Sequence, residues 1–139
     1  MYKHILLAAD GSENAVRAAK EAVKIASCLK ESLIEVVYVV DFDQSKSDVL
    51  HSSSSEARDL ERRRKISKVE QALKESKISY KVTFLHGTPG PAIVKYANER
   101  QVDLVVIGSR GLNGLQEMVL GSVSHKVMKR VNCPALIVK

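Results

Sequence analysis

The sequence predicts a single α/β domain over residues 1–139, with an open, parallel five-stranded sheet and helices on both of its faces. Five short apolar runs are nearly continuous in Ile, Leu and Val, which is typical of parallel strands covered on both faces. Helical patterns lie between these runs, so strands and helices alternate along the chain, as in right-handed parallel crossovers. With 139 residues, 45% apolar and 27% charged, the chain can bury its own core without disulfides or metal.

The predicted strands are short segments that open, divide and close the chain. In order they span residues 3–8, 33–40, 80–85, 103–107 and 135–138. Because the chain has no Trp and only 4% aromatic residues, the core that these strands form must be aliphatic. The same scarcity argues against a surface that stacks the bases of single-stranded nucleic acid.

The predicted helices lie in the four connections between these strands. Apolar residues recur at helical spacing over residues 15–29, and more weakly over 66–73 in the second connection. Thr88 and Pro89 are typical of an N-cap followed by a first-turn proline, so a third helix begins there. Residues 123–131 supply the apolar side of the last helix.

One stretch of low complexity interrupts this alternation. Six of the twelve residues over 44–55 are Ser, and the stretch lies between the second strand and the second helix. Its composition predicts a solvated loop, with a lid over the strand ends as the alternative interpretation.

The predicted topology indicates where a ligand would bind. In open parallel sheets, ligands bind at the carboxyl ends of the strands, where the strand order reverses. This rule selects the residues that follow the first, second and fourth strands.

The segment after the fourth strand has the composition of a phosphate-binding loop. Gly108 and Gly111 leave the strand, and the chain returns as Gly121-Ser122 at the start of a helix. Glycine allows a ligand to approach the backbone closely, and the amides of a helix N-terminus attract phosphate. Ser122 adds a hydroxyl that can bind a phosphate oxygen. On the glycines alone, a tight turn with a helix cap explains the pattern equally well.

The spacing of these residues resembles the G-2x-G-9x-G-(S/T) motif of the ATP-binding universal stress proteins. The resemblance extends along the chain through residues 5–12, 38–41, 86–89, 107–111, 120–124 and 133–138. It implies the adenine-nucleotide-alpha-hydrolase-like fold with strand order 3-2-1-4-5. It also implies a stress-response protein in which bound ATP regulates conformation or partners.

The resemblance implies a set of nucleotide-binding residues. Ala9 and Asp10 would lie beside adenine and ribose, and the main chain of Val39 would contact adenine. The ribose and phosphates would be held by Gly108, Arg110, Gly111, Gly121, Ser122, Val123 and Ser124. Asp10 would also approach a divalent ion, Mg²⁺ or Mn²⁺, that bridges the phosphates. In the alternative interpretation, Asp10 or Ser12 simply caps the first helix.

The sequence favours binding over catalysis. There is no GxxxxGK[ST] motif, so the lysine that phosphoryl transfer normally requires is missing. The four histidines are scattered without ligand spacing, and no residue of the glycine loop is an evident base. We therefore expect a nucleotide-binding module with at most slow ATP hydrolysis.

The net charge of +6 is concentrated in one segment and suggests an alternative function. Residues 58–68 hold six basic and two acidic residues, with Arg62 to Lys65 as a continuous basic run. A solvated outer face is the simpler interpretation. The alternative is a nucleotide-independent interaction protein that docks an acidic partner or nucleic acid through this second helix. No helix-turn-helix or RNA-binding motif supports nucleic acid as a partner.

Partners and compartment follow from the remaining features. A terminal strand leaves an edge that can pair with a second copy, and related proteins dimerise there, so we expect a homodimer through Ala135 to Val138. No apolar run reaches the ~20 residues of a membrane span or the pattern of a signal peptide. We therefore expect a cytoplasmic protein that does not bind membranes, with Cys28 and Cys133 as reduced thiols on the core side.

Overall fold

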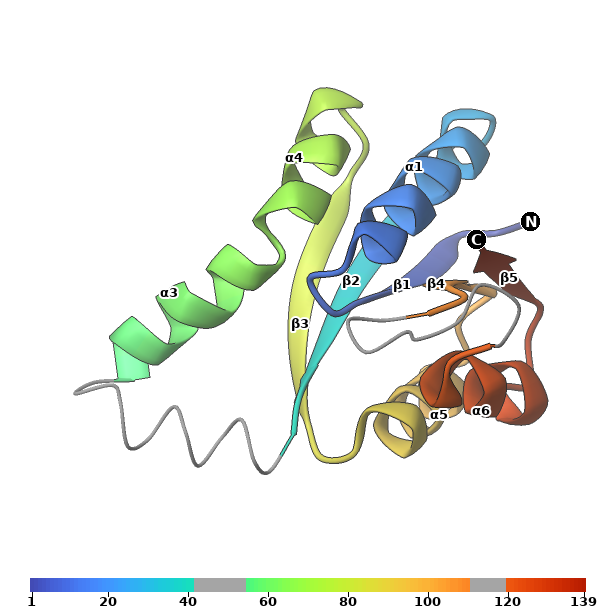
Figure 1. Ribbon diagram of the computed structural model, residues 1–139. Coiled ribbons are helices and arrows are strands. Elements are labelled where there is room, and N and C mark those ends of the chain that lie inside the picture. The colour runs from blue at the N-terminus through green and yellow to red at the C-terminus, as the bar shows by residue number, and fades with distance from the viewer. Residues whose placement is uncertain (42–54, 111–119) are drawn as a thin grey trace.

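The fold is a five-stranded parallel sheet with strand order β3-β2-β1-β4-β5 (Figure 1). The computed structural model describes residues 1–41, 55–110 and 120–139, so the predicted loop over 44–55 lies almost entirely outside the described residues. The strands are β1 (His4–Ala9), β2 (Leu33–Val40), β3 (Tyr80–His86), β4 (Leu104–Gly108) and β5 (Ala135–Val138). This confirms the predicted class and strand order. Each predicted strand boundary is correct to within one residue.

The central strand, β1, forms the point at which the strand order reverses. It pairs in parallel with β2 on one side, from His4 opposite Leu33 to Ala9 opposite Tyr38. On the other side it pairs with β4. The connections therefore leave β1 in opposite directions, and the carboxyl ends of β1, β2 and β4 are neighbours at one edge of the sheet.

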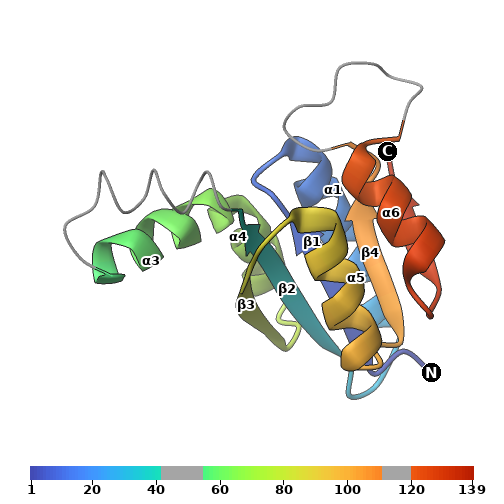
Figure 2. The ribbon, with the colours of Figure 1, turned by 90° about the horizontal axis from the view of Figure 1, so that it is seen from below.

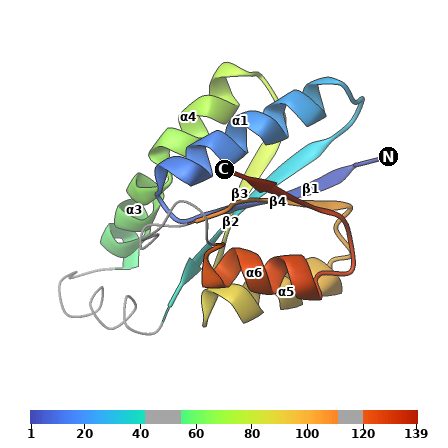
Figure 3. The same cartoon turned by 45° about the vertical axis from the view of Figure 1, so that its right-hand side comes forward.

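The helices cover the sheet in two layers, which Figure 3 shows most clearly. They are α1 (Glu13–Ser27), α3 (Ser55–Lys65), α4 (Ser67–Glu75), α5 (Pro89–Glu99) and α6 (Ser122–Arg130). The faces of α1 and α4 pack with β-strand residues such as Leu7 and Val36 in one apolar cluster. Those of α5 and α6 pack with Leu6 and Val37 in a second cluster. The alternation of residues along each strand thus separates two cores.

The second connection differs from the prediction of one helix. Ile66 is fully buried and separates α3 from α4, because the chain breaks its helical path there with φ −106° and ψ 13°. The predicted apolar residues Val69 and Leu73 lie on α4, whereas the basic run lies on α3, which extends beyond the edge of the sheet (Figure 2).

The two cysteines, both free thiols, were predicted to lie on the core side, and for Cys28 this is wrong. The first helix ends at Ser27, short of the predicted residue 29, so Cys28 is its exposed C-cap. Cys133 is partly buried and packs against the apolar cluster beneath α5 and α6. Among the described helices, none has the length and apolar character needed to cross a bilayer.

Candidate functional site

A cavity of about 320 Å³ lies at the carboxyl edge of the sheet. It is bounded by the ends of β1, β2 and β4 and by the first residues of α1, α5 and α6. Its lining residues are Ala8, Ala9, Asp10, Ser12, Ala15, Tyr38, Val39, Asp41, Pro89, Ile93, Ile107, Gly108, Arg110, Gly121, Ser122, Val123 and Ser124. The cavity therefore lies where the reversal of strand order predicts a ligand.

The β1–α1 loop brings Asp10 and Ser12 to the cavity in different roles. Ser12 is the N-cap of α1, and its hydroxyl accepts a hydrogen bond from the amide of Ala15 at 3.2 Å. The Asp10 carboxylate accepts from the amide of Ser12 at 3.0 Å, which closes a turn through Gly11 at φ 86°. The capping alternative is therefore true of Ser12, while Asp10 shapes the loop and lines the cavity.

The N-terminus of α6 forms another wall of the cavity. Gly121 is its N-cap, and the amide of Gly121 donates to the carbonyl of Ser109 at 2.7 Å. The first amides of any helix have no acceptor within that helix, and they carry a partial positive charge. This end of α6 can therefore receive an anion.

The two serines in the first turn of α6 differ in burial. Ser124 is 2% exposed, and its hydroxyl donates to the carbonyls of Ser109 at 2.8 Å and Gly121 at 3.0 Å. Ser122 is exposed and lines the cavity. Ser124 therefore holds α6 against the end of β4, whereas the hydroxyl of Ser122 suits contact with a ligand.

Gly108 and Gly121 of the motif differ in whether packing requires a glycine. A Cβ at Gly108 would lie 2.7 Å from the Cβ of Asn14, closer than real side chains approach, so α1 can pack on β4 only over a glycine. A Cβ at Gly121 would meet its nearest neighbour, the carbonyl oxygen of Ser109, at 3.4 Å, and its φ of −64° is open to any residue. Packing requires glycine at Gly108, but it does not require glycine at Gly121.

The predicted nucleotide-binding residues converge on this cavity. Those that line it are Ala9, Asp10, Val39, Gly108, Arg110, Gly121, Ser122, Val123 and Ser124. Gly111 lies outside the described residues. The role of each in binding a ligand stays a prediction.

Sequence reasoning missed the contribution of α5. Pro89 and Ile93 line the cavity, because α5 begins at the carboxyl edge of the sheet. The sequence did contain a signal, since the predicted helix start at Thr88 and Pro89 follows a strand end.

Comparison with known proteins shows which family has this sequence pattern and fold. The sequence model described as Universal stress protein family matches residues 1–139. The chain belongs to the universal stress protein family. This confirms the resemblance that the glycine spacing indicated.

Individual universal stress proteins match over nearly the whole of this chain. Universal stress protein MJ0531 of Methanocaldococcus jannaschii is 35% identical over 144 residues, covering 100% of this chain and 83% of that protein. The solved structure of MJ0577, from the same organism, has a TM-score of 0.81 at 32% identity and covers 100% of this chain and 96% of its own. A universal stress protein solved in complex with cAMP has a TM-score of 0.75 at 24% identity, with coverages of 99% and 97%.

The basic run on α3 is partly neutralised within the chain. Arg63 donates to Glu70 at 2.8 Å and 3.2 Å, and the Tyr80 hydroxyl donates to the same carboxylate at 2.8 Å. The hydrogen bonds from Arg63 hold the pKa of Glu70 below its usual value, although burial alone would raise it. Arg62 and Arg64 each lie 3.7 Å from an acidic side chain on the preceding turn. The run therefore has contacts within the fold as well as with solvent.

Proposed function

We propose that this universal stress protein binds ATP in the carboxyl-edge cavity, and that occupancy of the cavity regulates its conformation or its partners. The observation that supports this most strongly is the convergence of apolar side chains and the N-terminus of α6 on one cavity. The universal stress protein complex with cAMP supports an adenine nucleotide as the ligand class.

The order of the strands suggests how the nucleotide would lie. Val39 on β2 and Ile93 on α5 offer an apolar surface for the base, next to the main chain at the end of β2. Gly121 and Ser122 lie at the start of α6, and β1 separates β2 from β4. In our proposal the base occupies the β2 side, the ribose lies near Ala9, and the phosphates reach α6.

We propose binding without efficient catalysis. Among the described residues that line the cavity, Arg110 has the one cationic side chain, and no lysine approaches the phosphate side. Within the same described residues, no group of three His, Cys, Asp or Glu side chains could hold a metal. Asp10 fits the role of a single contact to a divalent ion that the phosphates themselves bind, since Mg²⁺ commonly uses few protein ligands beside a nucleotide. Any hydrolysis would then be slow.

Calorimetric titration with ATP and Mg²⁺ tests the proposal. We expect saturable binding to the purified protein, and loss of binding in Gly121→Val, whose side chain would enter the phosphate side of the cavity. Circular dichroism of this variant should match the parent protein. Absence of binding at millimolar ATP, with a folded protein, would contradict the proposal. Binding of AMP but not ATP would support an adenine site and contradict the proposal that the ligand is a triphosphate.

We further propose that the protein is a cytoplasmic homodimer joined through β5. Among the described residues, β5 is the terminal strand of the sheet and pairs with β4, and in our proposal its other edge pairs with a second copy. Light scattering at micromolar concentration should give the mass of a dimer. A monomer mass would contradict the proposed interface.

The alternative function, docking of an acidic partner through the basic helix, has one observation in its favour. Leu60 is 70% exposed on α3, beside the basic run. Exchange of Arg62, Arg63 and Arg64 for Gln should weaken salt-dependent binding to an acidic partner if this surface is used. Unchanged affinity would eliminate this alternative.

A further inference from the structure

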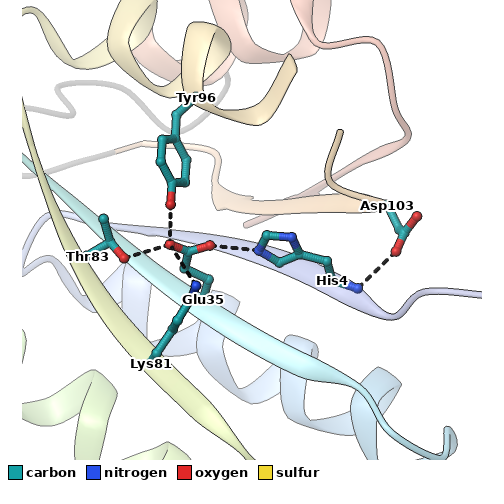
Figure 4. A network of polar contacts seen from close by, with 6 residues as sticks. All are labelled: His4, Glu35, Lys81, Thr83, Tyr96 and Asp103. Atoms are coloured by element: carbon teal, nitrogen blue, oxygen red, sulfur yellow. Dashed lines mark hydrogen bonds and ion pairs between the residues drawn. The ribbon is translucent and has the colours of Figure 1, made fainter. Parts of the chain in front are cut away.

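A fully buried carboxylate, Glu35, lies on β2 away from the cavity lining (Figure 4). Its Oε2 atom accepts hydrogen bonds from the hydroxyls of Thr83 at 2.6 Å and Tyr96 at 2.5 Å. Its Oε1 atom lies 2.7 Å from Nε2 of His4, and Nζ of Lys81 lies 3.9 Å from Oε2. Such a cluster of donors around one carboxylate stabilises its charged form.

The electrostatics of Glu35 agree with this geometry. Burial alone would raise its pKa, but the hydrogen bonds from Thr83, Tyr96 and His4, together with the charge of Lys81, hold the pKa below its usual value. An ionised carboxylate only accepts hydrogen bonds, so Nε2 of His4 carries the proton in this contact. Glu35 therefore serves as an anion around which the fold arranges its donors.

These donors come from different layers of the molecule. His4 lies on β1, and Lys81 and Thr83 lie on β3, the two strands that flank β2. Tyr96 lies on α5, so its hydroxyl connects a helix to the sheet. Among these four partners, Tyr96 alone lies on a helix.

The connected helix also forms a wall of the cavity. Residues 35, 37 and 39 of β2 point to the same face, which α5 covers. The helix runs back along β2, so Tyr96 lies over the beginning of the strand and Ile93, one turn earlier, packs in the same cluster as Val39. Ile93 and Val39 both line the cavity. A shift of α5 along β2 would therefore move one wall of the cavity relative to the other.

We propose that Tyr96 and Glu35 are positioning residues for the cavity: their hydrogen bond sets where α5 lies along β2, and thereby how Pro89 and Ile93 face a bound nucleobase. The inference rests on the proposed function, in that the cavity is taken to bind an adenine nucleotide. Neither Glu35 nor Tyr96 lines the cavity.

Thr83 provides a matched control. The hydroxyls of Thr83 and Tyr96 donate to the same oxygen of Glu35, and each can be removed with little change of shape, by Thr83→Val and Tyr96→Phe. Phe retains the ring on which Arg100 stacks at 5.3 Å. Both changes remove one donor from a buried carboxylate, but only Tyr96→Phe removes the hydrogen bond by which α5 itself contacts Glu35. A purely structural role for the cluster predicts equal effects of the two changes on binding.

The experiment is calorimetric titration of parent protein, Tyr96→Phe and Thr83→Val with AMP, which contains the base without the triphosphate. We expect the affinity of Tyr96→Phe to fall by about 3- to 30-fold, the range of indirect coupling between packed elements. Thr83→Val should stay within about twofold of the parent, although both variants unfold at lower urea concentration. Equal losses of affinity in the two variants, or no loss in Tyr96→Phe, would overturn the inference.

A second measurement keeps the inference testable if the parent protein binds no nucleotide, which would overturn the proposed function instead. Hydrogen exchange of the α5 amides, followed by mass spectrometry, reports the release of the helix without a ligand. We expect faster exchange over Pro89–Glu99 in Tyr96→Phe than in Thr83→Val. Equal exchange in the two variants would overturn the positioning role.

Discussion

The two ends of the strands differ in where negative charge lies, one at the start of β2 and the other at the carboxyl edge of the sheet. At the edge where β2 begins, Glu35 is 0% exposed and is surrounded by donors from β1, β3 and α5. At the carboxyl edge, the N-terminus of α6 faces a cavity of about 320 Å³. The anion is a side chain of the chain itself at one edge, and in our proposal it is the phosphate of a ligand at the other.

This difference shows how one helix layer can serve both stability and binding. Because α5 spans the two edges, Tyr96 contacts the internal carboxylate while Pro89 lines the cavity. Polar groups where β2 begins are satisfied within the fold, so changes there should lower stability, and loss of the Tyr96 hydroxyl should also affect the cavity through α5. Changes at the carboxyl edge should mainly lower the affinity for a ligand, except where a residue also supports packing.

The largest expected effect is that of removing the internal anion. Glu35→Ala would leave the hydroxyls of Thr83 and Tyr96 without their acceptor and open a cavity beneath α5. We expect the free energy of unfolding to fall by about 3–5 kcal/mol, as when one partner of a buried charged network is lost. Urea unfolding monitored by circular dichroism measures this, and a change below about 1 kcal/mol would show that the cluster is not a stabilising feature.

Substitution of the glycines at the carboxyl edge should show which of them packing requires. Gly108→Ala places a Cβ 2.7 Å from the Cβ of Asn14, so we expect a loss of about 1–3 kcal/mol from overpacking between β4 and α1. Gly121→Ala meets its nearest neighbour at 3.4 Å and is the matched control. We expect its unfolding midpoint in urea to stay close to that of the parent protein. Equal destabilisation by both changes would contradict the distinction.

Acid should weaken the edge that contains Glu35. Its pKa is lower in the folded protein than the usual value of 4.5, so the stability it contributes is fully present above that value. The contribution is lost as the pH falls through the lowered folded pKa, when the carboxylate is protonated. Urea midpoints measured from pH 6 to pH 3 should decrease once the pH falls below about 4.5. Glu35→Gln should show a shallower decrease, and an unchanged slope would assign the acid sensitivity to other groups such as Glu70, whose pKa is also lowered.

The smallest effects concern the two serines of α6. Ser124→Ala removes a buried hydroxyl that donates to the carbonyl of Ser109, and we expect a loss of about 1 kcal/mol in the free energy of unfolding. Ser122→Ala removes an exposed hydroxyl and should leave stability unchanged while weakening nucleotide binding. Thermal unfolding and calorimetric titration of both variants provide the comparison. The reverse pattern would exchange the structural and binding roles assigned to these serines.

The sequence predicted the fold and much of the site because both depend on local patterns. Apolar runs such as β2 identify buried parallel strands, and the alternation with helices restricts the topology to a parallel sheet. The spacing of Gly108, Gly121 and Ser122 carried the resemblance to the family that the comparisons confirm. The spacing could not show that packing requires glycine at Gly108 but not at Gly121, because that distinction depends on the distance from Gly108 to Asn14.

The sequence by itself determined the strands, their likeness to a known family and the edge of the sheet at which the cavity lies. Only the tertiary structure decided that Pro89 and Ile93 belong to the cavity and that Glu35 is a satisfied anion. The partners of Glu35 are 31, 48 and 61 residues away in the chain, so no local pattern connects them. A lone carboxylate within an apolar strand is costly until the fold brings its donors together, and their arrangement is a property of packing.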